Sequence, residues 1–287
     1  MKRTVFSLLL ILSTAALAPA QIVSYKLTGT AVSVDGGDYN SRILGEIAYI
    51  RGTSLTSSGA FGELGRGPGF QAEIIVAAGK RLSVGMGGGY YVIRKEGSMT
   101  WTGELDGKPF DASATIIPRL SVIPFFLNIH YTVRLTPGLS LDLFAGPVFQ
   151  IVQFNVENPS ATTVLDTNQV VTFTASKTSG GGQGGLGLNL RLFRGIELVA
   201  DAFYRSGSVA DLKGNWVKVG TSSLGAIAGS SAEYFLWAYD QTQEGTTYPR
   251  AGYFDLNGPT GDSISGIKKV EIDLGGLSFS AGIKINF

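Results

Sequence analysis

The chain has 287 residues, of which only 16% are charged, and its formal net charge is +1 at pH 7. This charged fraction is below the usual quarter of soluble domains, and the sequence contains no basic cluster to neutralise the phosphates of a nucleic acid. With no cysteine and one histidine, the chain cannot form disulfides, thiolate sites, a cysteine-linked lipid or a multi-histidine metal site, so we expect no metal or cofactor.

The N-terminus has the pattern of an export signal. Two basic residues precede an apolar run over residues 5–12, and small residues end in Ala-Pro-Ala at 18–20. This is an A-x-A cleavage pattern, and the apolar run is too short to anchor the chain across a bilayer. We therefore expect residues 1–20 to be a cleaved signal peptide and residues 21–40 to be a periplasmic extension. An extra strand near Lys26 is the alternative, but a ninth strand would place the two chain ends on opposite sides.

Segments that alternate apolar and polar residues follow, which is the pattern of β-strands. The clearest is the last one, where every second residue from Leu277 to Phe287 is apolar. The least regular is the first one, with Ile43, Gly45 and Ile47 on one face. The pattern predicts eight strands, at 41–52, 69–78, 82–93, 119–134, 139–152, 183–193, 195–206 and 276–287.

The connections between these strands alternate between short and long. The short ones lie near 79–81, 134–138 and 193–195, and the long ones near 53–68, 94–118, 153–182 and 207–275. Membrane β-barrels have short periplasmic turns at one end and long external loops at the other. We therefore expect residues 41–287 to form a single closed antiparallel up-and-down transmembrane β-barrel of eight strands, with long external loops and both termini in the periplasm.

The faces of the strands indicate which side meets lipid. Eight strands leave an interior that side chains just fill, and the large apolar residues would overfill it, whereas the glycine-rich polar face fits. The apolar face is therefore predicted to face outward, into the lipid of a bacterial outer membrane. The alternative is a soluble lipocalin-like carrier with its apolar face inside.

Several segments resemble a known family. Gly184 to Arg191 together with Phe203-Tyr204-Arg205, the segment Val122 to Phe125, the segment Leu143 to Gly146, and the ending Gly282 to Phe287 are similar to hairpins of small outer-membrane barrels of the OmpA, OmpX and OmpW type. The resemblance implies that Phe287 is the terminal signal read by the barrel-assembly machinery. It implies an architecture and no single function, because such barrels include adhesins, structural proteins, enzymes and channels.

Charged residues on the inward face are predicted to form a polar network in the lumen. If the turns are symmetric, Arg191 lies opposite Glu197, and His130 lies opposite Asp142. We interpret the network as an ionic plug, and the alternative is a proton or ion path. Its predicted members are Glu46, Glu73, His130, Asp142, Arg191, Glu197, Asp201, Arg205 and Lys284, with Arg42 as a further inward charge.

Two motifs suggest catalysis or cofactor binding but lack the context for it. His130 has Ser140 and Asp142 nearby, yet it is predicted near the periplasmic end, away from the outer rim where substrate would arrive. Residues 182–187 match G-x-G-x-x-G, but a strand follows where a dinucleotide site needs a helix. We therefore expect no enzyme.

The long loop over residues 207–275 mixes aromatic with small polar residues, which suits either a recognition surface or a lid over the barrel. The sequence favours a plugged outer-membrane barrel with a structural or surface-interaction role, with outer-membrane lipid and an extracellular ligand as partners and no nucleic acid. The alternatives are a narrow channel for small or apolar solutes and a membrane-embedded lipid or peptide hydrolase.

Overall fold

The computed structural model describes residues 23–52, 56–105, 108–163, 166–243 and 245–287, so the predicted signal peptide lies outside the described residues. The described chain is almost entirely β-structure, with one helix. In chain order the elements are β1 (Val23–Ser33), α2 (Gly37–Gly52), β2 (Thr56–Gly59), β3 (Arg66–Ala77), β4 (Leu82–Arg94), β5 (Gly97–Leu105), β6 (Lys108–Arg134), β7 (Leu139–Thr162), β8 (Thr167–Phe193), β9 (Ile196–Arg205), β10 (Ser208–Val209), β11 (Lys213–Ser222), β12 (Gly225–Gln243), β13 (Thr246–Phe254), β14 (Ile264–Lys269), β15 (Ile272–Asp273) and β16 (Gly276–Asn286).

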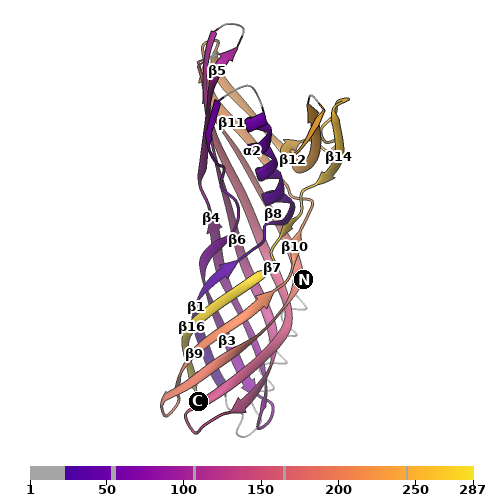
Figure 1. The fold of residues 1–287 in the computed structure, drawn as a ribbon. Helices are drawn as coiled ribbons and strands as arrows, with labels where there is room; N and C mark the ends of the chain where they lie inside the picture. The colour runs from indigo at the N-terminus through magenta and orange to yellow at the C-terminus, as the bar shows by residue number, and fades with distance from the viewer. Residues whose placement is uncertain (1–22, 53–55, 106–107, 164–165, 244) are drawn as a thin grey trace.

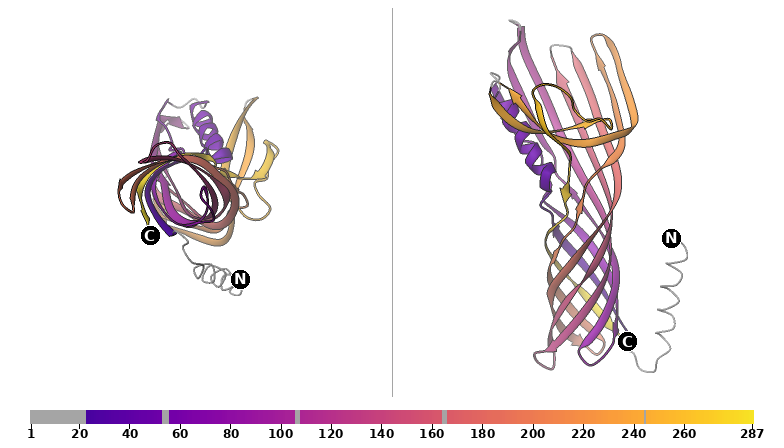
Figure 2. Two further views of the ribbon diagram at one scale, coloured as in Figure 1. Left: turned by 90° about the horizontal axis from the view of Figure 1, so that it is seen from below. Right: turned by 90° about the vertical axis from the view of Figure 1, so that its right-hand side faces the viewer.

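Part of this sheet closes on itself as a hydrogen-bonded ring. The ring runs β1-β3-β4-β6-β7-β8-β9-β16 and returns to β1, and every neighbouring pair is antiparallel. Viewed along its axis, the ring is a closed loop of strands (Figure 2). The short turns β3–β4, β6–β7 and β8–β9 lie at one end, and the first described residue meets the last one there, where the Phe287 amide donates to the Val23 carbonyl.

Three ring strands continue far beyond the ring. β6 and β8 have 27 residues each and β7 has 24, and their upper parts pair with β5 and β11. From there the sheet continues through β12 to β13 and β14, and α2 lies alongside it (Figure 1). We call this part, made of α2, β2, β5, β11–β14 and the upper parts of β6–β8, the extension.

The polarity of the long strands inverts where the extension begins. In lower β6 the outward residues are apolar, from Ile123 to Tyr131, and the inward ones include Asn128 and His130. In upper β6 the outward residues at 111–119 are mostly polar, whereas Leu120 and the other inward residues are apolar and buried. β7 and β8 invert in the same way. The lower ring thus has an apolar outside and a polar inside, and the extension has the reverse.

Apolar residues cover the outside of the lower ring on every ring strand, and together they form what we call the apolar band. Its large exposed members are Tyr25, Leu27, Phe70, Ile74, Leu82, Val84, Ile123, Phe125, Leu127, Ile129, Tyr131, Leu143, Phe149, Leu186, Leu188, Leu190, Leu192, Ile196, Leu198, Tyr204, Leu277, Phe279 and Ile283. The hydrophobic core lies higher, between α2 and the inward faces of the extended strands, and includes Tyr39, Ile43, Leu120, Phe154 and Phe173.

The structure corrects three sequence predictions. Residues 41–52 belong to helix α2 and not to a strand, because Tyr39, Ile43 and Ile47 recur at helical spacing and all three are buried. The N-terminal segment 21–40, predicted to be periplasmic and outside the barrel, contains β1, which replaces 41–52 as a ring strand. The predicted loops at 94–118 and 153–182 are largely continuous strand. The described chain therefore has sixteen strands where the sequence predicted eight.

Candidate functional site

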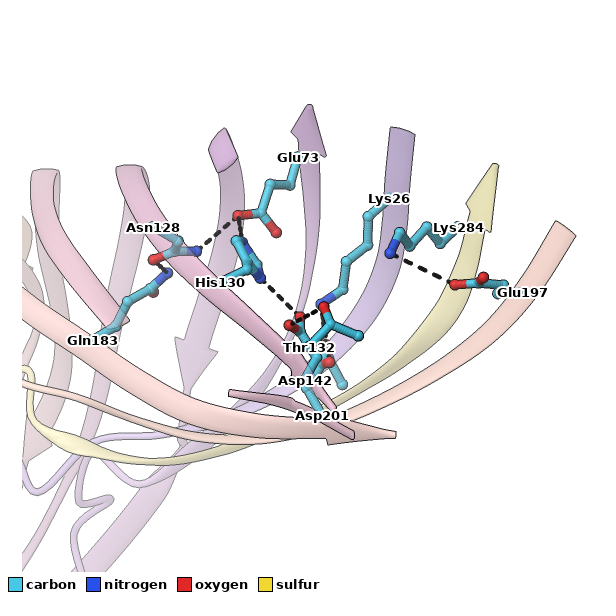
Figure 3. A network of polar contacts seen from close by, with 11 residues as sticks. Lys26, Glu73, Asn128, His130, Thr132, Asp142, Gln183, Glu197, Asp201 and Lys284 are labelled. Carbon is cyan, nitrogen blue, oxygen red and sulfur yellow. Dashed lines mark hydrogen bonds and ion pairs between the residues drawn. The ribbon is translucent and has the colours of Figure 1, made fainter. Parts of the chain in front are cut away.

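Polar side chains from several ring strands meet inside the lower ring, and we call them the lumen network (Figure 3). One part joins β1, β9 and β16. The Lys26 ammonium lies 2.9 Å from Asp201 Oδ1, and the Ser280 hydroxyl donates to Asp201 Oδ2 at 2.7 Å. Lys26 and Asp201 are both buried, so each charge is stabilised by the other and not by water.

His130 on β6 links two carboxylates from different strands. Its Nε2 lies 2.9 Å from Glu73 Oε1 on β3, and its Nδ1 lies 2.8 Å from Asp142 Oδ2 on β7. An ionised carboxylate can only accept, so both contacts are satisfied only when the ring carries a proton on each nitrogen. The geometry therefore fits an imidazolium between two carboxylates. Asn128 also donates to Glu73 Oε1 at 2.8 Å.

A third part of the lumen network rises toward the extension. Gln183 donates to Asn128 Oδ1 at 3.1 Å, and its own carbonyl oxygen accepts from Arg205 Nη2 at 3.1 Å. Arg205 is 1% exposed, and its guanidinium carbon lies 5.5 Å from the ring centre of Tyr91 and 5.4 Å from that of Phe203. Aromatic faces attract such a cation at these distances.

The lumen network is balanced in charge and closely packed around one small void. The cations Lys26, His130 and Arg205 balance the carboxylates of Glu73, Asp142 and Asp201. One void within the lumen network, lined by Lys26, Glu73 and Asp201 among others, has a volume of about 10 Å³. That is near the minimum for one water molecule, so nothing larger fits in this void. Above it, the inward faces of the strands form the hydrophobic core.

The predicted site residues fall into three groups. Glu73, His130 and Asp142 meet directly, and Asp201 and Arg205 belong to the same network. Arg191, Glu197 and Lys284 lie lower, at the short-turn end, where Lys284 Nζ is 3.6 Å from Glu197 Oε2. Arg191 is opposite Glu197 in the β8–β9 pairing, as the turn geometry predicts.

Three predictions about individual residues are wrong. Arg42, predicted as an inward charge of the barrel, lies on α2 in the extension and forms an ion pair with Asp240. Glu46 lies on α2 in the extension, where its carboxylate accepts two hydrogen bonds from Arg250, at 2.7 and 2.8 Å. The expected register of His130 against Asp142 is off by two residues, because the hairpin centres on Pro137 and places Thr132 opposite Asp142. His130 reaches Asp142 diagonally instead.

Sequence reasoning missed Lys26, Asn128 and Gln183. Lys26 was assigned to the predicted periplasmic segment 21–40. The alternation of Tyr25 and Leu27 with Lys26 and Thr28 was nevertheless a visible signal of a strand. The two amides carry no charge, so a search for charged inward residues passes over them. They connect the charged groups of the lumen network.

The short-turn end forms a basic vestibule that the linear sequence does not reveal. Two openings of about 570 Å³ each share Lys80, Arg81, Arg134, Arg191 and Lys284 in their linings. Arg194 also lines one of them. Within the described parts of the chain, Glu197 is the one carboxylate in these linings. Turns that are distant in sequence therefore gather several cations at one mouth of the ring.

The lumen network is not arranged as a hydrolytic triad. A triad requires a base whose free nitrogen faces a nucleophile. Both nitrogens of His130 face carboxylates, so neither nitrogen is free to face a nucleophile. Among the described residues, no group of three or more histidine, cysteine, aspartate or glutamate side chains is placed to hold a metal ion. No helix within those residues has the length and apolarity to cross a membrane.

Comparisons with known proteins do not assign this chain to a family. No family model and no curated protein matches it. One similar solved structure is a major outer membrane protein from Thermus thermophilus, with 12% identity, 92% of this chain and 99% of that chain covered, and a TM-score of 0.37. Another is the outer membrane protease OmpT from Escherichia coli, with 11% identity, 94% and 98% covered, and a TM-score of 0.34. At these TM-scores the likeness indicates neither a family nor an activity.

Proposed function

We propose that the ring is an eight-stranded transmembrane β-barrel of a bacterial outer membrane, plugged by the lumen network, and that the extension projects outward in a structural or surface-interaction role. The observation that carries this proposal is the inversion of polarity along β6, β7 and β8. A strand that passes from hydrocarbon into water has its apolar side chains outside in the first part and inside in the second.

The height of the apolar band supports the same proposal. From Ile123 to Tyr131 in β6, a rise of about 3.3 Å per residue and a tilt of about 40° give a band of roughly 23 Å. The outward apolar face of outer-membrane barrels is about 25 Å tall. A soluble carrier would leave this band in water, where exposed apolar patches of such size are rare.

The connections support a proposal for which end of the barrel faces which side of the membrane. Short turns and both ends of the barrel belong on the periplasmic side, and long structures belong outside. The extension is then external, the basic vestibule faces the periplasm, and the lipid partner contacts the apolar band. We propose that Phe287, which is exposed and packs edge-on against Tyr25, is the residue read by the barrel-assembly machinery.

The chain has no cysteine, so single introduced cysteines report this topology without background. Three positions are suitable. Leu224, which is 92% exposed, lies in the β11–β12 turn, Lys80 lies in the β3–β4 turn, and Leu127 lies in the apolar band. In whole cells, a charged membrane-impermeant maleimide should label only Leu224→Cys. Lys80→Cys should react once the outer membrane is permeabilised, and Leu127→Cys should stay unlabelled until the protein is unfolded.

Labelling of Leu127→Cys in the folded protein would exclude the membrane assignment, since only a water-exposed thiol reacts with a charged reagent. Labelling of Lys80→Cys in whole cells would instead reverse the orientation. The alternative functions are weaker: the void of about 10 Å³ opposes an open channel, and the occupied nitrogens of His130 oppose a hydrolase built on that residue.

A further inference from the structure

A further cavity lies in the extension, separate from the lumen network and from the basic vestibule. It has a volume of about 340 Å³ and lies between α2, the inward faces of β5, β6 and β7, and the strands β12 and β13. Small-molecule sites start at about this size. Its apolar walls include Ile43, Trp101, Ala114, Ile116, Val156 and Leu236.

Two polar atoms of the cavity lining have no partner among the described residues. They are the hydroxyl of Tyr39, a side chain only 2% exposed, and Oδ1 of Asn158. Buried polar groups nearly always have a hydrogen-bond partner, so an unpartnered pair in one cavity calls for one. Burial raises the pKa of Tyr39 well above its ordinary value. The phenol therefore stays protonated and is a donor, whereas Asn158 Oδ1 is an acceptor.

The charged residues of the lining are already paired. Arg42 donates to the carbonyl oxygen of Tyr239 at 2.9 Å and forms an ion pair with Asp240. Glu46 accepts both of its hydrogen bonds from Arg250. Burial lowers the pKa of Arg250, but the hydrogen bonds to Glu46 outweigh it, and the net shift is upward. No charge in the lining is left to bind an ionic ligand.

We propose that this cavity is a binding site for a neutral, mainly apolar small molecule with one hydroxyl group, which accepts from Tyr39 and donates to Asn158. The apolar walls provide most of the contact area, and the two unpartnered atoms select the hydroxyl. This site goes beyond the proposed structural role, and it does not depend on the membrane assignment because the extension is outside the apolar band.

The test uses 1-naphthol as the probe, with the mature protein in lipid nanodiscs and empty nanodiscs subtracted. Calorimetry should show saturable binding of one 1-naphthol per chain. Naphthalene lacks the hydroxyl and therefore both of its hydrogen bonds, so it should bind roughly thirtyfold more weakly. 1-Methoxynaphthalene accepts but cannot donate to Asn158, so it should also bind more weakly. Anionic 1-naphthoate should bind least.

Variants assign the binding to this cavity. Tyr39→Phe removes only the hydroxyl and should weaken 1-naphthol roughly five- to tenfold while leaving naphthalene unchanged. Ala114→Phe fills the cavity and should abolish binding. Tyr234→Phe, a tyrosine of the extension that stacks on Trp216 outside the lining, is the matched control and should bind like the wild type.

Three results would overturn the proposal. The first is that 1-naphthol binds no better to nanodiscs with the protein than to empty nanodiscs. The second is that Tyr39→Phe binds 1-naphthol with the same affinity as the wild type. The third is that 1-naphthoate binds more strongly than 1-naphthol. Circular dichroism identifies a variant that fails to fold. In that case the ligand series on the wild-type chain decides the outcome alone.

Discussion

His130 is the residue on which the lumen network depends most. Its side chain is 2% exposed and separates Glu73 from Asp142, so two buried carboxylates share one cation. Removing one partner of a buried charge pair is far more costly than replacing the whole set by neutral groups, because the remaining charge stays buried without compensation. This asymmetry makes the role of His130 testable by comparing a single with a multiple variant.

We expect His130→Ala to lower the free energy of unfolding by about 3–5 kcal/mol. The triple variant Glu73→Gln, His130→Gln and Asp142→Asn should recover most of this loss, since it removes the charges together. Urea titration of the protein in lipid vesicles measures both. Lys213→Gln, which breaks an exposed ion pair with Glu233, is a control that should have little effect. A triple variant as unstable as His130→Ala would contradict the charge argument.

Glycine at position 85 creates the space in which His130 and Glu73 meet. A methyl group there would overlap Glu73 Oε1 and lie 2.7 Å from His130 Nε2. We expect Gly85→Ala to lower the free energy of unfolding by about 1–3 kcal/mol through overpacking. Gly184→Ala is the matched control, because its methyl group would meet its nearest atom, Phe144 O, at 3.5 Å, an ordinary contact. Equal stability of the two variants in the same titration would contradict this prediction.

Helix α2 shows at the scale of an element why one local pattern was misread. Residues 41–52 contain both an alternation of Ile43, Gly45 and Ile47 and a helical spacing of Tyr39, Ile43 and Ile47. The alternation predicted a strand. The helix forms because the face with Tyr39, Ile43 and Ile47 is buried in the hydrophobic core, whereas Leu44 on the opposite face is 51% exposed. The sequence alone does not contain the contact surface that decides between the two.

The contact between α2 and β13 explains the glycine within the helix. A methyl group at Gly45 would overlap the carbonyl oxygen of Pro249. Alanine normally favours a helix by about 1 kcal/mol over glycine. We expect Gly45→Ala to loosen α2 nevertheless and to speed proteolysis of the extension. Leu44→Ala, on the exposed face, should leave the proteolysis rate unchanged. A Gly45→Ala protein that resists protease better than the wild type would show that α2 is not closely packed against β13 at this position.

The strands themselves were predicted well where polarity is constant and poorly where it inverts. The predictions at 82–93 and 195–206 closely match β4 and β9. The prediction for β7 ended at residue 152, although the alternation continues through Phe154 and Val156. There the apolar residues change to the other face, so a search for one continuous apolar stripe stops. The lumen residues His130 and Asp142 were predictable for the same reason that β4 was, since they lie below the inversion.

At the scale of the whole molecule, the proposed plug has two levels, the lumen network and the hydrophobic core above it. We expect no sustained conductance from the wild-type protein in planar bilayers. Lys26→Ala combined with Asp201→Ala removes a neutral pair from the lower level and should also stay silent, because the core is intact. Sustained current in the double variant alone would show that the core does not seal. Current in the wild type would refute the plugged barrel.

The length of β6, β7 and β8 gives the molecule a mechanical property. A strand of 27 residues is about 90 Å long, and at a tilt of about 40° it rises roughly 70 Å, so about 45 Å lies beyond an apolar band of about 25 Å. In the proposed membrane arrangement, the same backbone runs through the part within the lipid and the part outside it. A force applied to the outer tip would therefore be transmitted along these strands to the segment held by lipid.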